Sequence, residues 1–157
     1  MDSYRDFDDL LRCFIDANVD FVVVGAHALA IYDRPRATKD LDVWIRPTAE
    51  NAERVWHGLT MFGAPLDRVT RGDFTSDNTV FQIGVAPIRI DILTSITGVT
   101  FDEAWPHRVL VTRAGISVPH IGIEEYLRNK DAAGRDQDRI DAAAVRARRR
   151  RSDSEKR

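Results

Sequence analysis

The spacing of apolar and polar positions along the chain predicts helices and strands in a mixed order. Residues 4–17 carry apolar side chains at helical spacing, which predicts a helix, and the apolar run 19–24 predicts a buried strand that ends at Gly25. Strong helix formers predict a short helix over residues 26–32, directly after this glycine. A second apolar run predicts a strand over residues 38–45.

The second half of the chain continues this mixture of elements. Thr48 is a good N-cap and Gly63 a good terminator, so they predict a helix over residues 49–62, and a loop over residues 64–77 follows. The remaining expected elements are two strands, a hairpin around Ala114-Gly115 and two helices separated at Gly134, at residues 79–84, 88–93, 107–112, 116–121, 123–133 and 136–148. This order predicts an α+β domain of α/β-like character, in which helices flank a mixed β-sheet and two helices form the C-terminal end.

Length and composition narrow the class of protein. A chain of 157 residues predicts one domain, and 43% hydrophobic with 31% charged residues is typical of a soluble globular protein. No apolar run approaches the roughly 20 residues of a membrane-spanning helix. The N-terminus is polar and acidic, unlike a secretory signal, and the single Cys13 excludes an intrachain disulfide. We therefore expect a cytoplasmic protein without a membrane partner.

The net charge of −2 conceals an uneven distribution of charge along the chain. Residues 146–157 hold six arginines and one lysine against Asp153 and Glu155, a balance of +5, so the other 145 residues sum to −7. We expect a domain over residues 1–147 and a basic tail over residues 148–157. The tail is either a disordered, solubilising end or a source of phosphate contacts to RNA.

Two carboxylates lie inside the second predicted strand. Asp40 and Asp42 are separated by one apolar residue, so in a strand they point to the same face. Like charges this close repel, and each raises the other's pKa unless a positive charge lies between them. A divalent cation bound by oxygen, usually Mg²⁺, removes this conflict and indicates chemistry on phosphates. The alternative is an edge strand whose acidic face is solvated.

A third carboxylate lies in the predicted strand 88–93. The alternation there places Asp91 on the same face as Arg89 and opposite to the isoleucines. If this strand neighbours the acidic pair, three carboxylates hold two Mg²⁺ ions, one to activate an attacking hydroxyl and one to hold a triphosphate and stabilise the leaving pyrophosphate. The alternative is an exposed face on which Arg89 and Asp91 pair.

The junction between the first strand and its helix offers backbone donors for a phosphate. Gly25 and Ala26 let the first helical turn approach a ligand, and the free N–H groups there suit an anion. Arg36, in the loop before the acidic strand, is a candidate to hold the triphosphate or the leaving pyrophosphate. The alternatives are a tight turn without a ligand and a solvated arginine, and His27 is either a ligand contact or a packed histidine.

Together these stretches resemble the polymerase-β-like nucleotidyltransferase superfamily. The resemblance rests on Val24-Gly25-Ala26-His27, Asp40-Leu41-Asp42-Val43 and Ile90-Asp91-Ile92. The sequence Arg-Ala-Thr-Lys-Asp-Leu-Asp at residues 36–42 is similar to minimal bacterial members, among them the abortive-infection and type IV toxin–antitoxin nucleotidyltransferases. Residues 124–130 and the acidic helix that starts at Asp136 are also similar, so the resemblance covers roughly residues 19–147.

The resemblance implies a nucleotidyltransferase-like fold and an enzyme that moves an NMP from an NTP such as ATP to a hydroxyl of tRNA, a protein or a small molecule. It implies Mg²⁺ or Mn²⁺ bound by Asp40, Asp42 and Asp91, and a toxin or antitoxin as partner. It assigns nucleotide contacts to Gly25, Ala26, His27, Arg36, Thr38 and Lys130. A solvated helix lysine is the alternative for Lys130.

The chain departs from the family pattern in two ways. Many active members have Gly-Gly or Gly-Ser where this chain has Gly25-Ala26, so alanine offers only its backbone N–H. Toxin members often carry a further helical domain, for which this chain has no room. Two other functions therefore fit the same residues: a catalytically silent nucleotide-binding module such as an antitoxin, and a metal-dependent phosphohydrolase.

Overall fold

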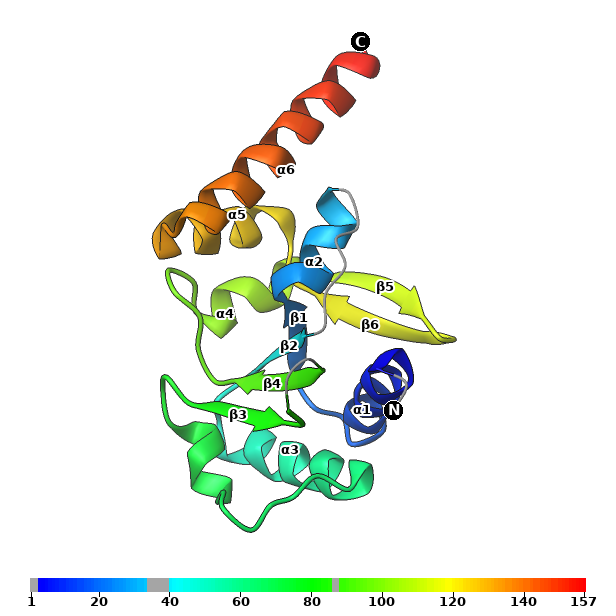
Figure 1. Ribbon diagram of the computed structural model, residues 1–157, viewed down its shortest axis with the longest axis vertical. Helices are drawn as coiled ribbons and strands as arrows, with labels where there is room; N and C mark the ends of the chain where they lie inside the picture. Colours follow the sequence, from blue (N-terminus) through cyan, green and yellow to red (C-terminus); the bar gives the residue numbers. More distant parts are fainter. Residues whose placement is uncertain (1–2, 34–39, 86–87) are drawn as a thin grey trace.

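The computed structural model describes residues 3–33, 40–85 and 88–157, and it shows a mixed β-sheet with helices on both faces (Figure 1). The α-helices are α1 (Ser3–Asp16), α2 (Gly25–Tyr32), α3 (Ala49–Phe62), α4 (Phe101–Ala104), α5 (Ile123–Ala133) and α6 (Asp136–Glu155). The strands are β1 (Phe21–Val24), β2 (Asp40–Ile45), β3 (Val80–Ile83), β4 (Arg89–Leu93), β5 (Val109–Arg113) and β6 (Ile116–His120), and two short 3₁₀ helices cover Arg71–Thr75 and Trp105–His107. The expected α+β class with C-terminal helices is confirmed.

The strands are arranged in the order β3-β4-β2-β1-β6-β5. Strand β2 is parallel to β4, and β1 is parallel to β6, whereas the other neighbouring pairs are antiparallel. Strand β2 is therefore paired on both edges, and its backbone is fixed by β1 and β4. This position decides where the acidic pair lies.

The sheet separates two hydrophobic clusters, as the alternation of side chains along each strand requires. Leu41 and Val43 of β2 pack with α1 and α3 on one face. Trp44 packs on the opposite face with α2, α4, α5 and α6. Because Asp40 and Asp42 alternate with Leu41 and Val43, they belong to the face of Trp44.

Local sequence explains where several elements begin and end. The Thr48 side chain accepts a hydrogen bond from the Asn51 N–H at the start of α3, and Gly63 ends this helix with a φ of +86°. Ala114 and Gly115 both have positive φ between β5 and β6, as a two-residue hairpin turn of the primed type requires. The helix over residues 49–62 and the hairpin at Ala114-Gly115 are therefore confirmed.

The expected loop over residues 64–77 contains a turn of 3₁₀ helix. Thr70 and Asp73 form a capping box at its start, and Phe74 is buried within it. The sequence reasoning missed this element because a five-residue helix shows no periodic pattern.

The C-terminal helix is longer than expected. Helix α6 ends at Glu155, so residues 148–155 are helical where a disordered tail was expected. Arginine is a good helix former, and no glycine or proline interrupts this stretch. The division of the chain at residue 147 stays a prediction. Among the described residues, no helix is long and apolar enough to cross a lipid bilayer.

Candidate active site

The three predicted carboxylates lie on two neighbouring strands. In the parallel register of β2 and β4, Asp42 is opposite Asp91, and Asp40 is opposite Arg89. The sheet topology excludes the solvated edge strand as an explanation for the acidic pair, because β2 is paired on both sides. Asp91 is buried and the Asp40 side chain is 45% exposed. The carboxylate cluster thus runs from the interior toward solvent.

The guanidinium of Arg89 lies between two of these carboxylates. Its Nη2 is 3.5 Å from Asp40 Oδ2 and donates a hydrogen bond to Asp91 Oδ2 at 3.3 Å. Its Nε is 3.0 Å from Asp91 Oδ1, a contact between charges without the alignment of a hydrogen bond. The sequence reasoning treated Arg89 only as a partner of Asp91 on an exposed face. Its contact with Asp40 depends on the register between β2 and β4, which no local pattern reveals.

Burial and neighbouring negative charge raise the pKa values of two carboxylates in the cluster. Burial, with Asp91 and Asp40 next in importance, raises the pKa of Asp42 to about 6, although Lys130 and Arg89 act in the opposite direction. Burial also raises the pKa of Asp91, despite the charge and hydrogen bond of Arg89. The site therefore disfavours full ionisation of its own carboxylates, and an additional cation would relieve this cost.

The residues present fit a divalent cation in their chemistry. Carboxylate oxygens from Asp40, Asp42 and Asp91 are the ligands that Mg²⁺ prefers, and Asp91 Oδ1 is buried without a hydrogen bond from the described residues. As they are oriented in the described parts of the chain, no three His, Cys, Asp or Glu side chains form a metal-binding group. Arg89 contacts two of the carboxylates instead. Metal binding by this cluster stays a prediction.

The turn between β1 and α2 lies against the acidic strand. Gly25 has a φ of +71°, and a Cβ atom placed on it would lie 2.3 Å from Asp42 Oδ2. Only glycine therefore fits between this turn and the carboxylate. Val24, the N-cap of α2, provides no side-chain hydrogen bond to the helix start. Gly25 thus brings the first turn of α2 beside Asp42, whereas phosphate binding by Gly25 and Ala26 stays a prediction.

His27 has the environment of a packed histidine. Its ring makes an edge contact with Phe7 at 5.4 Å between centroids, and its Nδ1 lies 3.1 Å from Arg113 Nη1. Burial and then the charge of Arg113 lower the pKa of His27 to about 4, so the ring is neutral at pH 7. The structure favours the packed alternative over a ligand contact, and a role of His27 in nucleotide binding stays a prediction.

Lys130 lies close enough to the carboxylates to influence them. It is on α5, its side chain is only 13% exposed, and its Nζ is 3.3 Å from Asp138 Oδ1. Its charge lowers the pKa of Asp42. The alternative of a solvated helix lysine is therefore wrong, whereas a contact with nucleotide stays a prediction. Arg36 and Thr38 fall within residues 34–39, which lie outside the described part of the chain.

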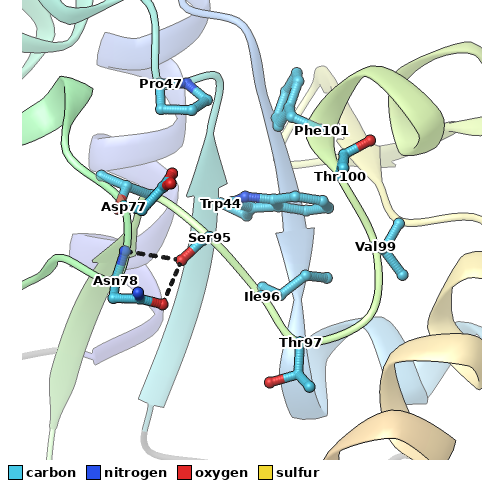
Figure 2. Close-up of a pocket in the computed structure, with 11 residues that line it drawn as sticks. Trp44, Pro47, Asp77, Asn78, Ser95, Ile96, Thr97, Val99, Thr100 and Phe101 are labelled. Atoms are coloured by element: carbon cyan, nitrogen blue, oxygen red, sulfur yellow. Dashed lines mark hydrogen bonds between the residues drawn. The ribbon is translucent and has the colours of Figure 1, made fainter.

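A pocket of about 510 Å³ opens on the same face of the sheet, at the C-terminal ends of β2 and β4 (Figure 2). Trp44, two residues beyond Asp42, lies in its middle between Phe101 and Ile96, and Ser95 bonds to Asn78 at its edge (Figure 2). Its described lining contains no lysine, arginine or histidine. The sequence reasoning did not find this pocket, because residues 77–78 and 94–101 approach Trp44 only in the folded sheet.

Comparisons with known proteins agree on the fold. No model of a known protein family matches the chain, and no curated protein matches its sequence. The chain is similar in structure to TM1012 from Thermotoga maritima, a protein provisionally assigned as a nucleotidyltransferase, with a TM-score of 0.60, 16% identity, and coverage of 98% of this chain and 92% of that one. It is also similar to ANT(2″)-Ia, solved in complex with adenylyl-2″-tobramycin, with a TM-score of 0.51, 15% identity, and coverage of 94% and 99%. The chain therefore has the nucleotidyltransferase fold.

Proposed function

We propose that the protein is a nucleotidyltransferase that depends on Mg²⁺ or Mn²⁺ and moves an NMP from an NTP to an acceptor hydroxyl, with release of pyrophosphate. The observation that carries this proposal is the β2–β4 register, which sets Asp42 beside Asp91 while Gly25 lies against Asp42. Three carboxylates and an uncapped helix start on one face are the parts that this chemistry requires.

In this proposal Asp40, Asp42 and Asp91 hold the metal. When bound, the divalent cation compensates the charge of the phosphates and acidifies the attacking hydroxyl. The N–H groups of Gly25 and Ala26 donate hydrogen bonds to phosphate oxygens at the start of α2. Lys130 supplies positive charge beside the triphosphate. Arg36, with Thr38 and His27 as further candidates from the sequence, would complete the nucleotide site.

The transfer balances without an additional reactant. The acceptor oxygen forms a bond with the α-phosphorus while the bond from this phosphorus to the oxygen of the β-phosphate breaks. Pyrophosphate leaves with the electron pair, and the hydroxyl proton passes to solvent. The residues of the site position the two oxygens and compensate charge, which are the main contributions of a protein to phosphoryl transfer.

The pocket beside Trp44 is our candidate for the acceptor. Its described lining has no cationic side chain, so it suits an uncharged or positively charged molecule better than a triphosphate. ANT(2″)-Ia carries an adenylylated tobramycin, which makes aminoglycosides one acceptor class to test beside tRNA and proteins. A role in a toxin–antitoxin pair and a cytoplasmic location belong to the same proposal.

A second function is favoured by one observation. Because Arg89 contacts Asp40 and Asp91, it can replace a metal ion as the counter-charge of the cluster. The protein would then be a catalytically silent module that binds a nucleotide, for example as an antitoxin. Nucleotide binding without product formation would distinguish this function from transfer.

The decisive experiment uses α-³²P-labelled NTPs with MgCl₂ or MnCl₂ and separate pools of tRNA, cell protein and aminoglycosides. We expect label to enter one pool together with pyrophosphate release, and the rate to fall at least 10²-fold in Asp42→Asn, which keeps the shape of the side chain but loses its charge. Transfer that persists in Asp42→Asn would refute the assignment. Release of free NMP or phosphate without a labelled acceptor would instead indicate a phosphohydrolase.

A further inference from the structure

Helix α6 continues beyond the body of the protein. Its first half is held by buried residues, the last of which is Val145, whereas every residue from Arg148 onward is exposed. Figure 1 shows the C-terminal half of α6 projecting away from the sheet and the other helices. The eight residues from 148 to 155 extend the helix by roughly 12 Å. We call residues 146–157 the arginine arm.

The arginine arm carries a charge opposite to that of the body. Its balance is +5, against −7 for the rest of the chain. Arg146 pairs with Asp131 and Arg149 pairs with Glu124, and both contacts tie the base of the arm to α5. Arg148, Arg150 and Arg151 make no ion pair with any residue that the structure describes. Three of the four arginines from Arg148 to Arg151 are therefore available to a partner.

The four arginines from Arg148 to Arg151 surround the helix. Successive residues of an α-helix are separated by 100°, so four in sequence cover the whole circumference within one turn. Like charges at this spacing repel, and residues 148–157 contain no apolar side chain that could support the helix by packing. A partner with negative charge on several sides would relieve this repulsion, whereas a flat acidic surface would reach only one side.

We propose that the arginine arm binds in the groove of a double-helical nucleic acid, between its two rows of phosphates. An α-helix with side chains is about 10–12 Å wide, which matches the roughly 12 Å width of the major groove of B-DNA. Arginines on opposite sides of the helix then face the phosphates on opposite sides of the groove. This inference goes beyond the proposed function, because the arm is separate from the carboxylate cluster.

The experiment measures binding of the full chain to two fluorescein-labelled probes, a 20-base-pair DNA duplex and an RNA hairpin with a bulged stem. Fluorescence anisotropy is recorded between 50 and 200 mM NaCl, without NTP or divalent metal. Three phosphate contacts, one each for Arg148, Arg150 and Arg151, predict a slope of log K against log[NaCl] of about −2.7 for the duplex. Binding to either probe supports the proposal, and the preferred probe identifies the nucleic acid.

Two variants with the same loss of charge separate the arm from general attraction. The arm variant replaces Arg148, Arg149, Arg150 and Arg151 by glutamine, which keeps good helix formers in place. The control variant replaces four other exposed arginines by glutamine, namely Arg68, Arg71, Arg108 and Arg128. We expect at least a tenfold loss of affinity and a flatter salt slope in the arm variant, and less than a threefold change in the control. Circular dichroism and thermal unfolding verify that both variants fold.

Three results would overturn the inference. Unchanged binding by the arm variant would exclude the arm as the contact, and an equal loss in the control variant would indicate attraction by net charge alone. A change in sedimentation of the arm variant without a change in nucleic-acid binding would assign the arm to a protein contact. Since neither probe requires the carboxylates, Asp42→Asn should bind both as the native chain does, whatever the outcome of the transfer assay.

Discussion

Replacement of Gly25 by alanine should destabilise the protein through two separate effects. The first is backbone strain, because alanine at a φ of +71° costs roughly 1–2 kcal/mol. The second is a collision, because the new Cβ would lie 2.3 Å from Asp42 Oδ2 and 3.2 Å from Asp42 Cγ. Displacement of a packed side chain costs about 1–3 kcal/mol. The sum predicts a loss of about 2–5 kcal/mol in the free energy of unfolding.

Gly63 provides the matched control. Its φ is +86°, and a Cβ there would meet no atom within 4 Å. Gly63→Ala should therefore show only the backbone cost of about 1–2 kcal/mol. In an Asp42→Ala background, Asp42 Oδ2 and Cγ are removed and only the Cβ at 3.3 Å is left, so the added Cβ at position 25 should cost little more than it does at position 63. The double-mutant cycle isolates the contact between the turn and the carboxylate.

The measurement is equilibrium unfolding in urea, monitored by far-UV circular dichroism and analysed by linear extrapolation. We expect Gly25→Ala to lower the midpoint more than Gly63→Ala does, with similar m-values, and most of this excess to disappear in the Asp42→Ala background. Equal losses for Gly25→Ala and Gly63→Ala in the native background would refute the close approach of the turn to Asp42. An excess of undiminished size in the Asp42→Ala background would assign the loss of stability to a cause other than the carboxylate.

Three further predictions concern the charge and shape of the site. The pKa of His27 is lowered in the folded protein, so the unfolded chain binds the proton more tightly, and the free energy of unfolding should fall by about 1–3 kcal/mol between pH 7 and pH 4. Urea titrations of His27→Asn at the same pH values should not show this loss. Millimolar MgCl₂ should raise the melting temperature, and it should raise that of Arg89→Met by more, although this variant is less stable without Mg²⁺. A smaller rise in Arg89→Met than in the native protein would argue against competition between Arg89 and the metal. Thr97→Trp, at the exposed side of the Trp44 pocket, should reduce label transfer to the acceptor at least tenfold and leave the affinity for a fluorescent ATP analogue unchanged. An equal loss of transfer and of nucleotide affinity would place the nucleotide in this pocket.

The fold could be predicted because most of its elements depend on local patterns. The Thr48 cap, the Gly63 terminator and the Ala114-Gly115 turn each specify a backbone conformation within a few residues, and the structure has all three. The end of α6 was placed too early because a dense run of like charges is typical of disordered ends. In the structure, Arg149 pairs with Glu124 of α5, a contact that the sequence does not reveal.

Only part of the candidate site could be predicted from the sequence. The acidic pair on β2 needed nothing but strand alternation, and Gly25 needed only the strand–helix junction. The position of Asp91 beside Asp42 required that β2 and β4 be parallel neighbours in one particular register. The same register brings Arg89 to Asp40. The contact of Arg89 with Asp40 was missed because strand pairing cannot be read from the local sequence.

The charge balance of the site connects metal binding to nucleotide affinity. Three carboxylates, those of Asp40, Asp42 and Asp91, carry more charge than the two cations Arg89 and Lys130 that act on Asp42. Lys130 is also paired with Asp138. The unliganded cluster is thus negative when fully ionised, and it should repel a triphosphate. A divalent cation reverses the sign of this balance, so we expect nucleotide affinity to depend strongly on Mg²⁺. Isothermal titration with a non-hydrolysable ATP analogue, with Mg²⁺ or with EDTA, measures this dependence; equal affinity in both would show that Arg89 and Lys130 suffice, which is the behaviour of the silent nucleotide-binding module.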